Sequence, residues 1–203
     1  MKSTRVAVLS VAALACAAGL ALARSTPPEK KMTPEEVAKI AEQMMALAQP
    51  GPEHKVLERM AGEWKSRVTV SMMPGQPPDV SEGTSTTRMI LGGRFLEIRN
   101  AGHLMGQPFE GLTILGFDRR SDLFTVVGYD TVGTYYVTGQ GPARPDGTLV
   151  LSGTTHDPRH NHTEKYEFHY AQPDNDHLVW RILFDQGAGT MAEVVKVELT
   201  RVE

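Results

Sequence analysis

Hydrophobic and polar positions change their period once along this chain, close to residue 64. Before that point, apolar side chains recur every three or four residues, the spacing of a helix with one apolar face. After it, apolar and polar side chains alternate, the spacing of a β-strand. The pattern predicts a helical N-terminal segment over 33–62 and an all-β domain over 63–203.

The helical segment carries its own start and stop signals. Thr33 suits the N-cap, Pro34 the first helical position, and Glu36 completes a capping box. Pro50 and Gly51 end the helix. Its apolar stripe consists of Val37, Ile40, Ala41, Met44, Leu47 and Ala48. A second, short helix is expected over 52–62, with Leu57 and Met60 facing inward.

Ten alternating runs follow, separated by turn sequences and with no helix between them. They lie at 63–73, 80–90, 94–101, 109–118, 123–130, 134–141, 148–157, 163–170, 177–185 and 190–202. Strands at this spacing are typical of an antiparallel sandwich or barrel. Short links favour pairing between neighbours, and closure removes exposed sheet edges. The sequence therefore predicts an up-and-down barrel of about ten antiparallel strands.

The first residues have the composition of a targeting segment. Lys2 and Arg5 precede an apolar run over 6–22, and Ala21-Leu22-Ala23 is a small-residue cleavage pattern. We expect a signal peptide over 1–23, a linker over 24–32, and export to the periplasm or beyond. The alternative is a lipoprotein anchored at Cys16, although "ALAC" lacks the usual leucine three places before the cysteine.

Cysteine usage and charge narrow the possible partners. Cys16 is the only cysteine and lies in the removed segment, so the mature domain has no disulfides and depends on core packing. The formal charge of −3 becomes −5 when the two positive charges of Lys2 and Arg5 are removed. That mild acidity argues against nucleic acid or an anionic membrane as a partner.

Four short motifs occur in an order that resembles one known family. They are H-x-x-L-x-x-x-x-G-x-W from His54 to Trp64, "GGRFLE" from Gly92, "GQPFEGLTILGFD" from Gly106, and "EVVKVELTR" ending at Arg201. Together they resemble the bacterial family catalogued as domain of unknown function 1579, over residues 53–202.

That family is similar to the calycins, which include lipocalins, fatty-acid-binding proteins and nitrobindin-like haem barrels. The resemblance implies a calycin-like barrel with Trp64 at its closed base and Arg201 near the indole ring. Closure independently requires the first and last strands to meet, and a guanidinium over an indole is favourable. The resemblance implies little about function, because such barrels serve many functions.

Aromatic residues that alternate along the later strands indicate a lined interior. The candidates for ligand binding are Tyr129, Tyr136, Tyr166, Phe168 and Trp180, with Arg181 as an anchor for a ligand carboxylate. The first functional hypothesis is a non-enzymatic shell that binds a small apolar or amphipathic molecule. In the alternative interpretation, the aromatic residues are ordinary core and Arg181 extends into solvent.

The stretch "HDPRHNH" over 156–162 supports a second hypothesis. His156, His160 and His162 are candidate zinc ligands, and Asp157 adds a carboxylate. This loop would serve a metal-dependent or histidine-based enzyme. The alternative is a solvated hairpin loop, since Pro158 cannot continue a central strand.

Two further possibilities remain open at this stage. Haem would need an axial histidine, for which His103 and His169 are the candidates; neither stands out, and the principal expectation is no cofactor.

A third functional hypothesis is an interaction module of the cell envelope. In it, the helix over Thr33–Gln49 docks on another envelope protein or on a second copy of the chain.

Overall fold

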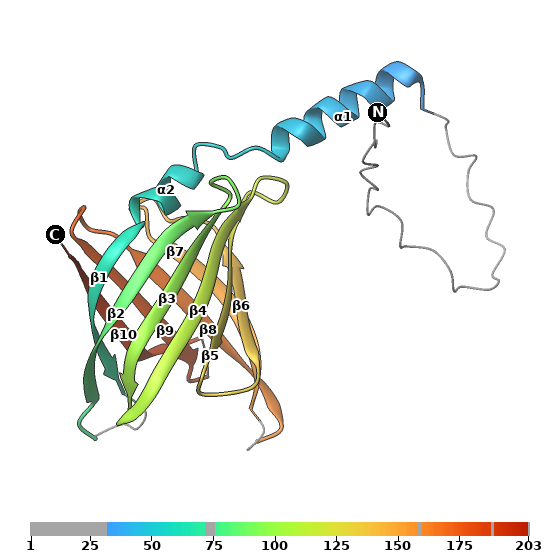
Figure 1. The fold of residues 1–203 in the computed structure, drawn as a ribbon. Helices are drawn as coiled ribbons and strands as arrows, with labels where there is room; N and C mark the ends of the chain where they lie inside the picture. The colour runs from blue at the N-terminus through green and yellow to red at the C-terminus, as the bar shows by residue number, and fades with distance from the viewer. Residues whose placement is uncertain (1–31, 72–75, 158–159, 188, 203) are drawn as a thin grey trace, which may run out of the picture.

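The computed structural model describes residues 32–71, 76–157, 160–187 and 189–202. The expected signal peptide over 1–23, and the linker as far as residue 31, lie outside these residues. The described chain forms two helices followed by ten strands (Figure 1). Neither described helix has the length and apolar character that crossing a membrane requires.

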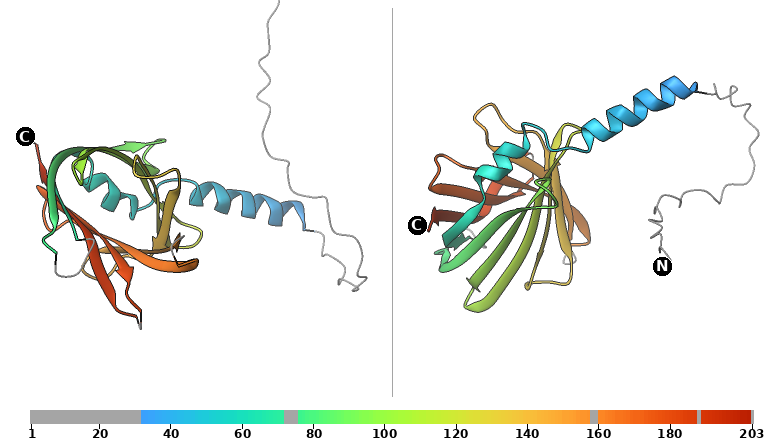
Figure 2. Two further views of the ribbon diagram at one scale, coloured as in Figure 1. Left: turned by 90° about the horizontal axis from the view of Figure 1, so that it is seen from below. Right: turned by 45° about the horizontal axis from the view of Figure 1, so that its top comes forward.

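Helix α1 (Pro34–Leu47) begins with the expected capping box. The Thr33 hydroxyl accepts a hydrogen bond from the Glu36 N–H, and the Glu36 carboxylate accepts one from the Thr33 N–H. No residue of α1 is buried, and Figures 1 and 2 show the helix projecting away from the barrel. Its apolar stripe is therefore exposed, with Val37 and Ile40 about half accessible to solvent.

Two arginines of the barrel hold the last turn of α1. Arg94 Nε donates a hydrogen bond to the Ala48 carbonyl at 3.0 Å. Arg119 Nη1 donates to the carbonyls of Ala46 and Gln49 at 2.6 and 3.1 Å. The last carbonyls of a helix lack partners within the helix and carry the negative end of its dipole, so cations are favourable there. The contacts fix where the helix leaves the barrel.

Helix α2 (His54–Arg59) lies across one end of the barrel, against β2, β3 and β4. Leu57 and the following Met60 are fully buried, as the sequence predicted. They join the main core cluster of Trp64, Leu96, Leu115, Phe124, Leu149, Leu151, Leu178 and Leu199. This end of the barrel is closed and packed.

The strands match the ten alternating runs to within a few residues. They are β1 (Gly62–Val70), β2 (Asp79–Ile90), β3 (Phe95–Leu104), β4 (Gln107–Asp118), β5 (Leu123–Asp130), β6 (Tyr136–Gly141), β7 (Leu149–Asp157), β8 (His162–Ala171), β9 (His177–Asp185) and β10 (Met191–Arg201). In β1, Trp64, Ser66 and Val70 are buried while Lys65 and Arg67 are exposed, so the predicted alternation separates inside from outside.

The sheet is a closed antiparallel meander, which confirms the predicted fold class. Each strand pairs with its neighbour in sequence, and β1 pairs with β10 from Trp64↔Arg201 to Val70↔Val195. The ladder is thin at one place: β6 and β7 share the single registered pair Gln140↔Ser152. That seam has the fewest registered pairs of the described ladders.

Candidate functional site

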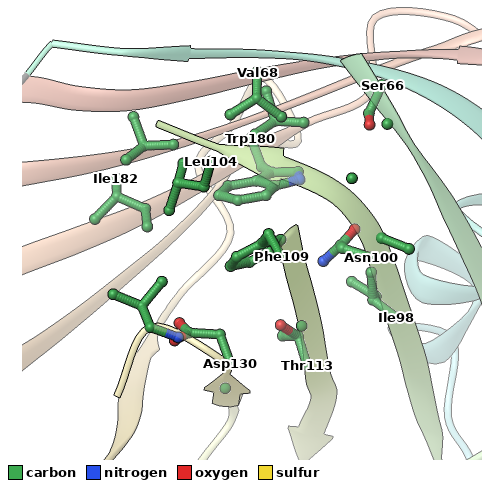
Figure 3. Close-up of a pocket in the computed structure, with 18 of the residues that line it drawn as sticks. Ser66, Val68, Ile98, Asn100, Leu104, Phe109, Thr113, Asp130, Trp180 and Ile182 are labelled. Atoms are coloured by element: carbon green, nitrogen blue, oxygen red, sulfur yellow. The ribbon is translucent and has the colours of Figure 1, made fainter. Parts of the chain in front are cut away.

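A cavity of about 240 Å³ occupies the half of the barrel away from α2 (Figure 3). Leu104 at the end of β3, Phe109 near the start of β4 and Asp130 at the end of β5 line its outer part. Val132 and Tyr135 of the β5–β6 connection complete this region. One end of the barrel is thus packed and the other hollow.

Glycines at inward positions make the space. Gly83, Gly102, Gly111 and Gly128 line the cavity, on four consecutive strands. Gly83 pairs directly with Gly102, and a Cβ on Gly83 would lie 2.5 Å from the Ala101 carbonyl oxygen. The glycines let neighbouring strands approach closely and remove four side chains from the interior.

The cavity wall is largely apolar, with a few polar groups. Its apolar side chains include Val68, Ile98, Phe168, Tyr170, Trp180, Ile182 and Val197. Ser66, Asn100 and Thr113 add hydroxyl and amide groups, and Figure 3 shows them around the same space as Phe109 and Trp180. Burial raises the pKa of the Tyr170 phenol, so it stays neutral. An apolar wall with a few polar groups is the usual composition of a small-molecule site.

The structure divides the predicted aromatic residues into three groups. Phe168 and Trp180 line the cavity. Tyr129 lies at its rim, half exposed, and Tyr136 is its cross-strand partner, with the ring centroids 6.1 Å apart. Tyr136 is 64% exposed and is not among the lining residues. Tyr166 is buried but does not line the cavity; its hydroxyl is hydrogen-bonded to the backbone of β6.

Tyr166 bridges the thin seam between β6 and β7. Its hydroxyl donates a hydrogen bond to the Thr138 carbonyl at 2.7 Å and accepts one from the Thr138 N–H at 3.0 Å. The ring passes over Gly153, where an added Cβ would meet ring carbons at 2.7 Å. One side chain thus satisfies a backbone donor and acceptor that the sparse ladder leaves open.

Arg181 lies outside the cavity. Its neighbours Trp180 and Ile182 line the interior, so alternation turns Arg181 to the outer face of β9. There its Nε pairs with a Glu193 carboxylate oxygen at 2.9 Å. The expected anchor for a ligand carboxylate is therefore absent from the described cavity wall, and the interpretation of Arg181 as a solvent-facing residue describes its position.

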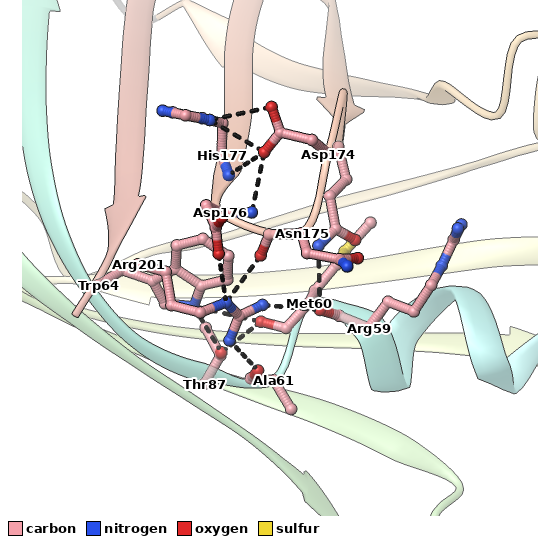
Figure 4. A network of polar contacts seen from close by, with 11 residues as sticks. Arg59, Met60, Ala61, Trp64, Thr87, Asp174, Asn175, Asp176, His177 and Arg201 are labelled. Atoms are coloured by element: carbon pink, nitrogen blue, oxygen red, sulfur yellow. Dashed lines mark hydrogen bonds and ion pairs between the residues drawn. The ribbon is translucent and has the colours of Figure 1, made fainter. Parts of the chain in front are cut away.

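The closed base is built around Trp64 and Arg201 (Figure 4). Trp64 Nε1 donates hydrogen bonds to the Met60 carbonyl and to the Thr87 hydroxyl, at 3.2 and 3.1 Å. The Arg201 guanidinium donates to the carbonyls of Ala61, Asn175 and Arg59, at 2.8, 2.7 and 3.1 Å. These contacts join α2, β1 and the β8–β9 loop to the last strand, in the arrangement implied by the family resemblance.

The histidine loop brings together a different set of donors from the one expected. The ligand atoms of Asp157, His160 and His162 lie within 4.8 Å of one another, and His156 is outside this group. His160 Nδ1 is 2.7 Å from an Asp157 carboxylate oxygen. The Asp157 side chain is buried, whereas both histidines are exposed. Alternation along β7 separates His156 from Asp157.

The two haem candidates do not share a site. His169 Nε2 lies 2.7 Å from a Glu167 carboxylate oxygen, and His169 is not among the cavity-lining residues. His103 is exposed and lines the cavity. Neither residue occupies a central inward position, which an axial ligand would need.

Sequence reasoning missed the residues that define the cavity. The inward glycines, Asn100, Thr113 and Asp130 were not candidates. The available signal was the alternation of inward and outward positions along each strand. Once the strands are in register, Asn100, Gly111 and Asp130 fall on the same side of the sheet as Ile98. Register follows from closure and cannot be obtained from one strand alone.

A solved structure supports this description of the fold. Rv2717c from M. tuberculosis is 16% identical, with a TM-score of 0.51 over 76% of this chain and all of that one. The S-type phycobiliprotein lyase CPES from Guillardia theta is 13% identical, with a TM-score of 0.49 over 76% of this chain and 99% of that one. Among curated proteins, none matches this sequence.

The closed ten-stranded meander with a packed base and a hollow far end defines a calycin-like β-barrel protein. Residues 49–201 match the family described as "Protein of unknown function (DUF1579)". The chain belongs to that family.

Proposed function

We propose that this protein binds a small apolar or amphipathic molecule in the barrel cavity and does no chemistry on it. The observation that carries the proposal is the glycine-made cavity of about 240 Å³, with a largely apolar wall and a few polar groups. Water takes about 30 Å³ per molecule in the liquid, so the enclosed part of the ligand is roughly eight water-sized groups.

Catalysis is left out of the proposal because the polar lining groups are not arranged as a reactive set. Nucleophilic catalysis needs a nucleophile within hydrogen-bond reach of a base. Among the described lining residues, neither the Ser66 nor the Thr113 hydroxyl is hydrogen-bonded to a histidine or a carboxylate. Such groups are suited to orienting a bound molecule.

A cavity-filling variant tests the proposal. Gly111→Leu adds a side chain inside, where the nearest atoms to the new Cβ belong to the Phe109 ring at 3.2 Å and the Asn100 amide at 3.6 Å. Thr84→Leu adds the same side chain at an exposed position of β2. We expect 1-octanol to bind the natural protein and the Thr84 variant in calorimetric titration, and to bind the Gly111 variant at least tenfold more weakly. Equal binding by all three would contradict a site in the cavity.

We also propose that the protein is exported, on the basis of the residues before Arg24. The positive start, the apolar run and Ala21-Leu22-Ala23 support this proposal. Expression with the native N-terminus and N-terminal sequencing of the product is the test. A mature chain beginning at Arg24 is expected. A product that retains residues 1–23 in the cytoplasm counts against export, and a lipid-modified Cys16 favours the anchored alternative.

Metal binding at the β7–β8 hairpin is a second candidate, favoured by the grouping of Asp157, His160 and His162. Two imidazoles and a carboxylate are zinc ligands, and three protein ligands leave a fourth position for water. Zinc should raise the melting temperature of metal-free protein, and His160→Ala should abolish the rise. The matched control is His177→Ala, because His177 likewise contacts the carboxylate of Asp174, three residues earlier. An identical response from all three proteins would remove the candidate.

A further inference from the structure

The ionisable residues that line the cavity are unbalanced in charge. Asp130 lies on the inner face with Gly128 and is the one inward-facing carboxylate among the described lining residues, because Glu82 alternates to the outer face beside Gly83; these lining residues include no lysine or arginine. His103, the other ionisable lining residue besides the tyrosines, also alternates to the outer face, next to Gly102. Arg181, the cation expected inside from the sequence, pairs with Glu193 on the outer face. A ligand entering this space therefore meets the Asp130 carboxylate and, among the described lining residues, no lysine or arginine.

Asp130 is the carboxylate best placed to meet a ligand. It is the last residue of β5 and sits directly opposite Gly111 of β4, which has no side chain to shield it. Its Oδ1 accepts a hydrogen bond from the Val132 N–H at 2.9 Å. In the described part of the chain, no lysine, arginine or histidine forms an ion pair with Asp130. Figure 3 shows its side chain beside Thr113 and Phe109, at the edge of the cavity.

Aromatic rings surround the same region. Phe109 and Tyr135 line the outer part of the cavity and Trp180 contributes its wall, while Tyr129 lies at the rim with its ring beside that of Tyr136. The negative faces of such rings attract cations, most strongly where water is partly excluded. By contrast, a ligand carboxylate would lose hydration here and face Asp130 with no compensating cation.

We propose that the cavity takes a cationic amphiphile: an apolar body of roughly eight non-hydrogen atoms inside, and an ammonium group at the Asp130 carboxylate. The size estimate follows from the 240 Å³ cavity and about 30 Å³ for each water-sized group. This inference rests on the proposed function, since it assigns a ligand class to the same cavity.

Three ligands that share an eight-carbon chain separate charge from shape: 1-octylamine, 1-octanol and octanoate. Calorimetric titration of the full mature chain at pH 7.5 should give the tightest binding for octylamine. We expect it to bind about fivefold more tightly than octanol, and octanoate to bind more weakly than either. The preference for octylamine over octanol should shrink with added salt, because the carboxylate is partly solvated.

The variant Asp130→Asn keeps the shape of the side chain and an oxygen to accept the Val132 hydrogen bond. We expect it to bind octylamine and octanol with equal affinity. Glu110→Gln is the control, since Glu110 is an exposed carboxylate of β4 outside the lining set. It should keep the full preference. A circular dichroism spectrum and a urea midpoint for each variant establish that the barrel is intact.

The outcomes separate the two proposals. Octanol binding with no preference for the amine, or a preference that survives in Asp130→Asn, overturns the cationic ligand class and leaves cavity binding standing. Octanoate binding more tightly than octylamine overturns it as well. Absence of binding by all three compounds overturns the proposed function together with the inference that rests on it.

Discussion

The guanidinium carbon of Arg201 lies 4.1 Å from the centroid of the Trp64 ring. The two residues are also direct partners in the β1–β10 ladder, so the contact forms where the barrel closes. Gly62 has a φ of +150°, and a Cβ there would collide with the Arg201 guanidinium. The Gly-x-Trp motif therefore has a physical meaning: the glycine leaves room for the cation, and the tryptophan ring receives it.

Replacing Arg201 by alanine should lower the free energy of unfolding by about 3 kcal/mol. The variant loses a cation–π contact worth about 1 kcal/mol and charged hydrogen bonds to three carbonyls, and it leaves these carbonyls with fewer donors. Urea denaturation followed by fluorescence measures the change.

Arg181→Ala is the matched control for this substitution. Arg181 pairs with Glu193 on the outer surface, and exposed ion pairs typically contribute less than about 1 kcal/mol. Equal losses for the two variants would show that the Trp64–Arg201 contact has no special part in closing the barrel.

Tyr166→Phe should destabilise the barrel by about 1–3 kcal/mol, because it leaves the Thr138 N–H and carbonyl without their partner at the β6–β7 seam. Hydrogen exchange at Thr138 should accelerate more than exchange elsewhere in β6. Tyr170→Phe is the comparison, since the Tyr170 hydroxyl has no hydrogen bond to the described residues. A larger loss for Tyr170→Phe than for Tyr166→Phe would contradict this account of the seam.

Stability should fall as the pH drops below about 6.5, in part through His54. Burial lowers the pKa of this imidazole from its ordinary value of 6.5, so the folded protein holds fewer protons than the unfolded chain. Unfolding then takes up a proton, and the stability that is present above pH 6.5 is lost as the pH falls through the folded-state pKa. Melting temperatures between pH 8 and 5 should vary less for His54→Asn than for the natural protein.

Removing α1 by starting the chain at Pro50 should cost less than about 1 kcal/mol, since no residue of α1 is buried and its contacts with Arg94 and Arg119 are exposed. Thermal unfolding of the two chains gives the difference. Size-exclusion chromatography of the same pair tests the interaction-module hypothesis. A full-length chain that elutes as a monomer argues against self-association through α1.

The sequence predicted the barrel because the same two local signals, alternation within a strand and a short turn after it, recur along the ten strands. Each strand carries its own period of two, and short turns leave few ways to pair neighbours. The first strand was expected to begin at 63 and begins at Gly62, and the sixth begins at Tyr136 where 134 was expected. Such shifts are normal at ends, where turns compete with the ladder.

The site was predicted less well, because the cavity forms where inward positions are glycine, and a pattern of large apolar residues does not mark such positions. The aromatic positions of β8 and β9 indicated an interior, and Phe168 and Trp180 line it. The same alternation already set Arg181 opposite Trp180. Because the aromatic face of β9 is the interior, Arg181 on the opposite face points outward and does not anchor a ligand inside. At the hairpin, His156 and Asp157 adjoin in sequence, yet only Asp157 joins the donor group, because adjacent strand residues point to opposite faces.

The arginine contacts at the end of α1 also fix which end of the barrel faces the N-terminal side of the chain. The chain enters at the packed base, where Arg94 and Arg119 contact the end of α1. Strand β5, whose last residue is Asp130, runs from that end toward the far end of the cylinder (Figure 1). Any attachment on the N-terminal side would therefore hold the barrel by its packed base, with the cavity end facing the surrounding medium. If the cavity binds a ligand as proposed, an attached copy would exchange that ligand without detaching.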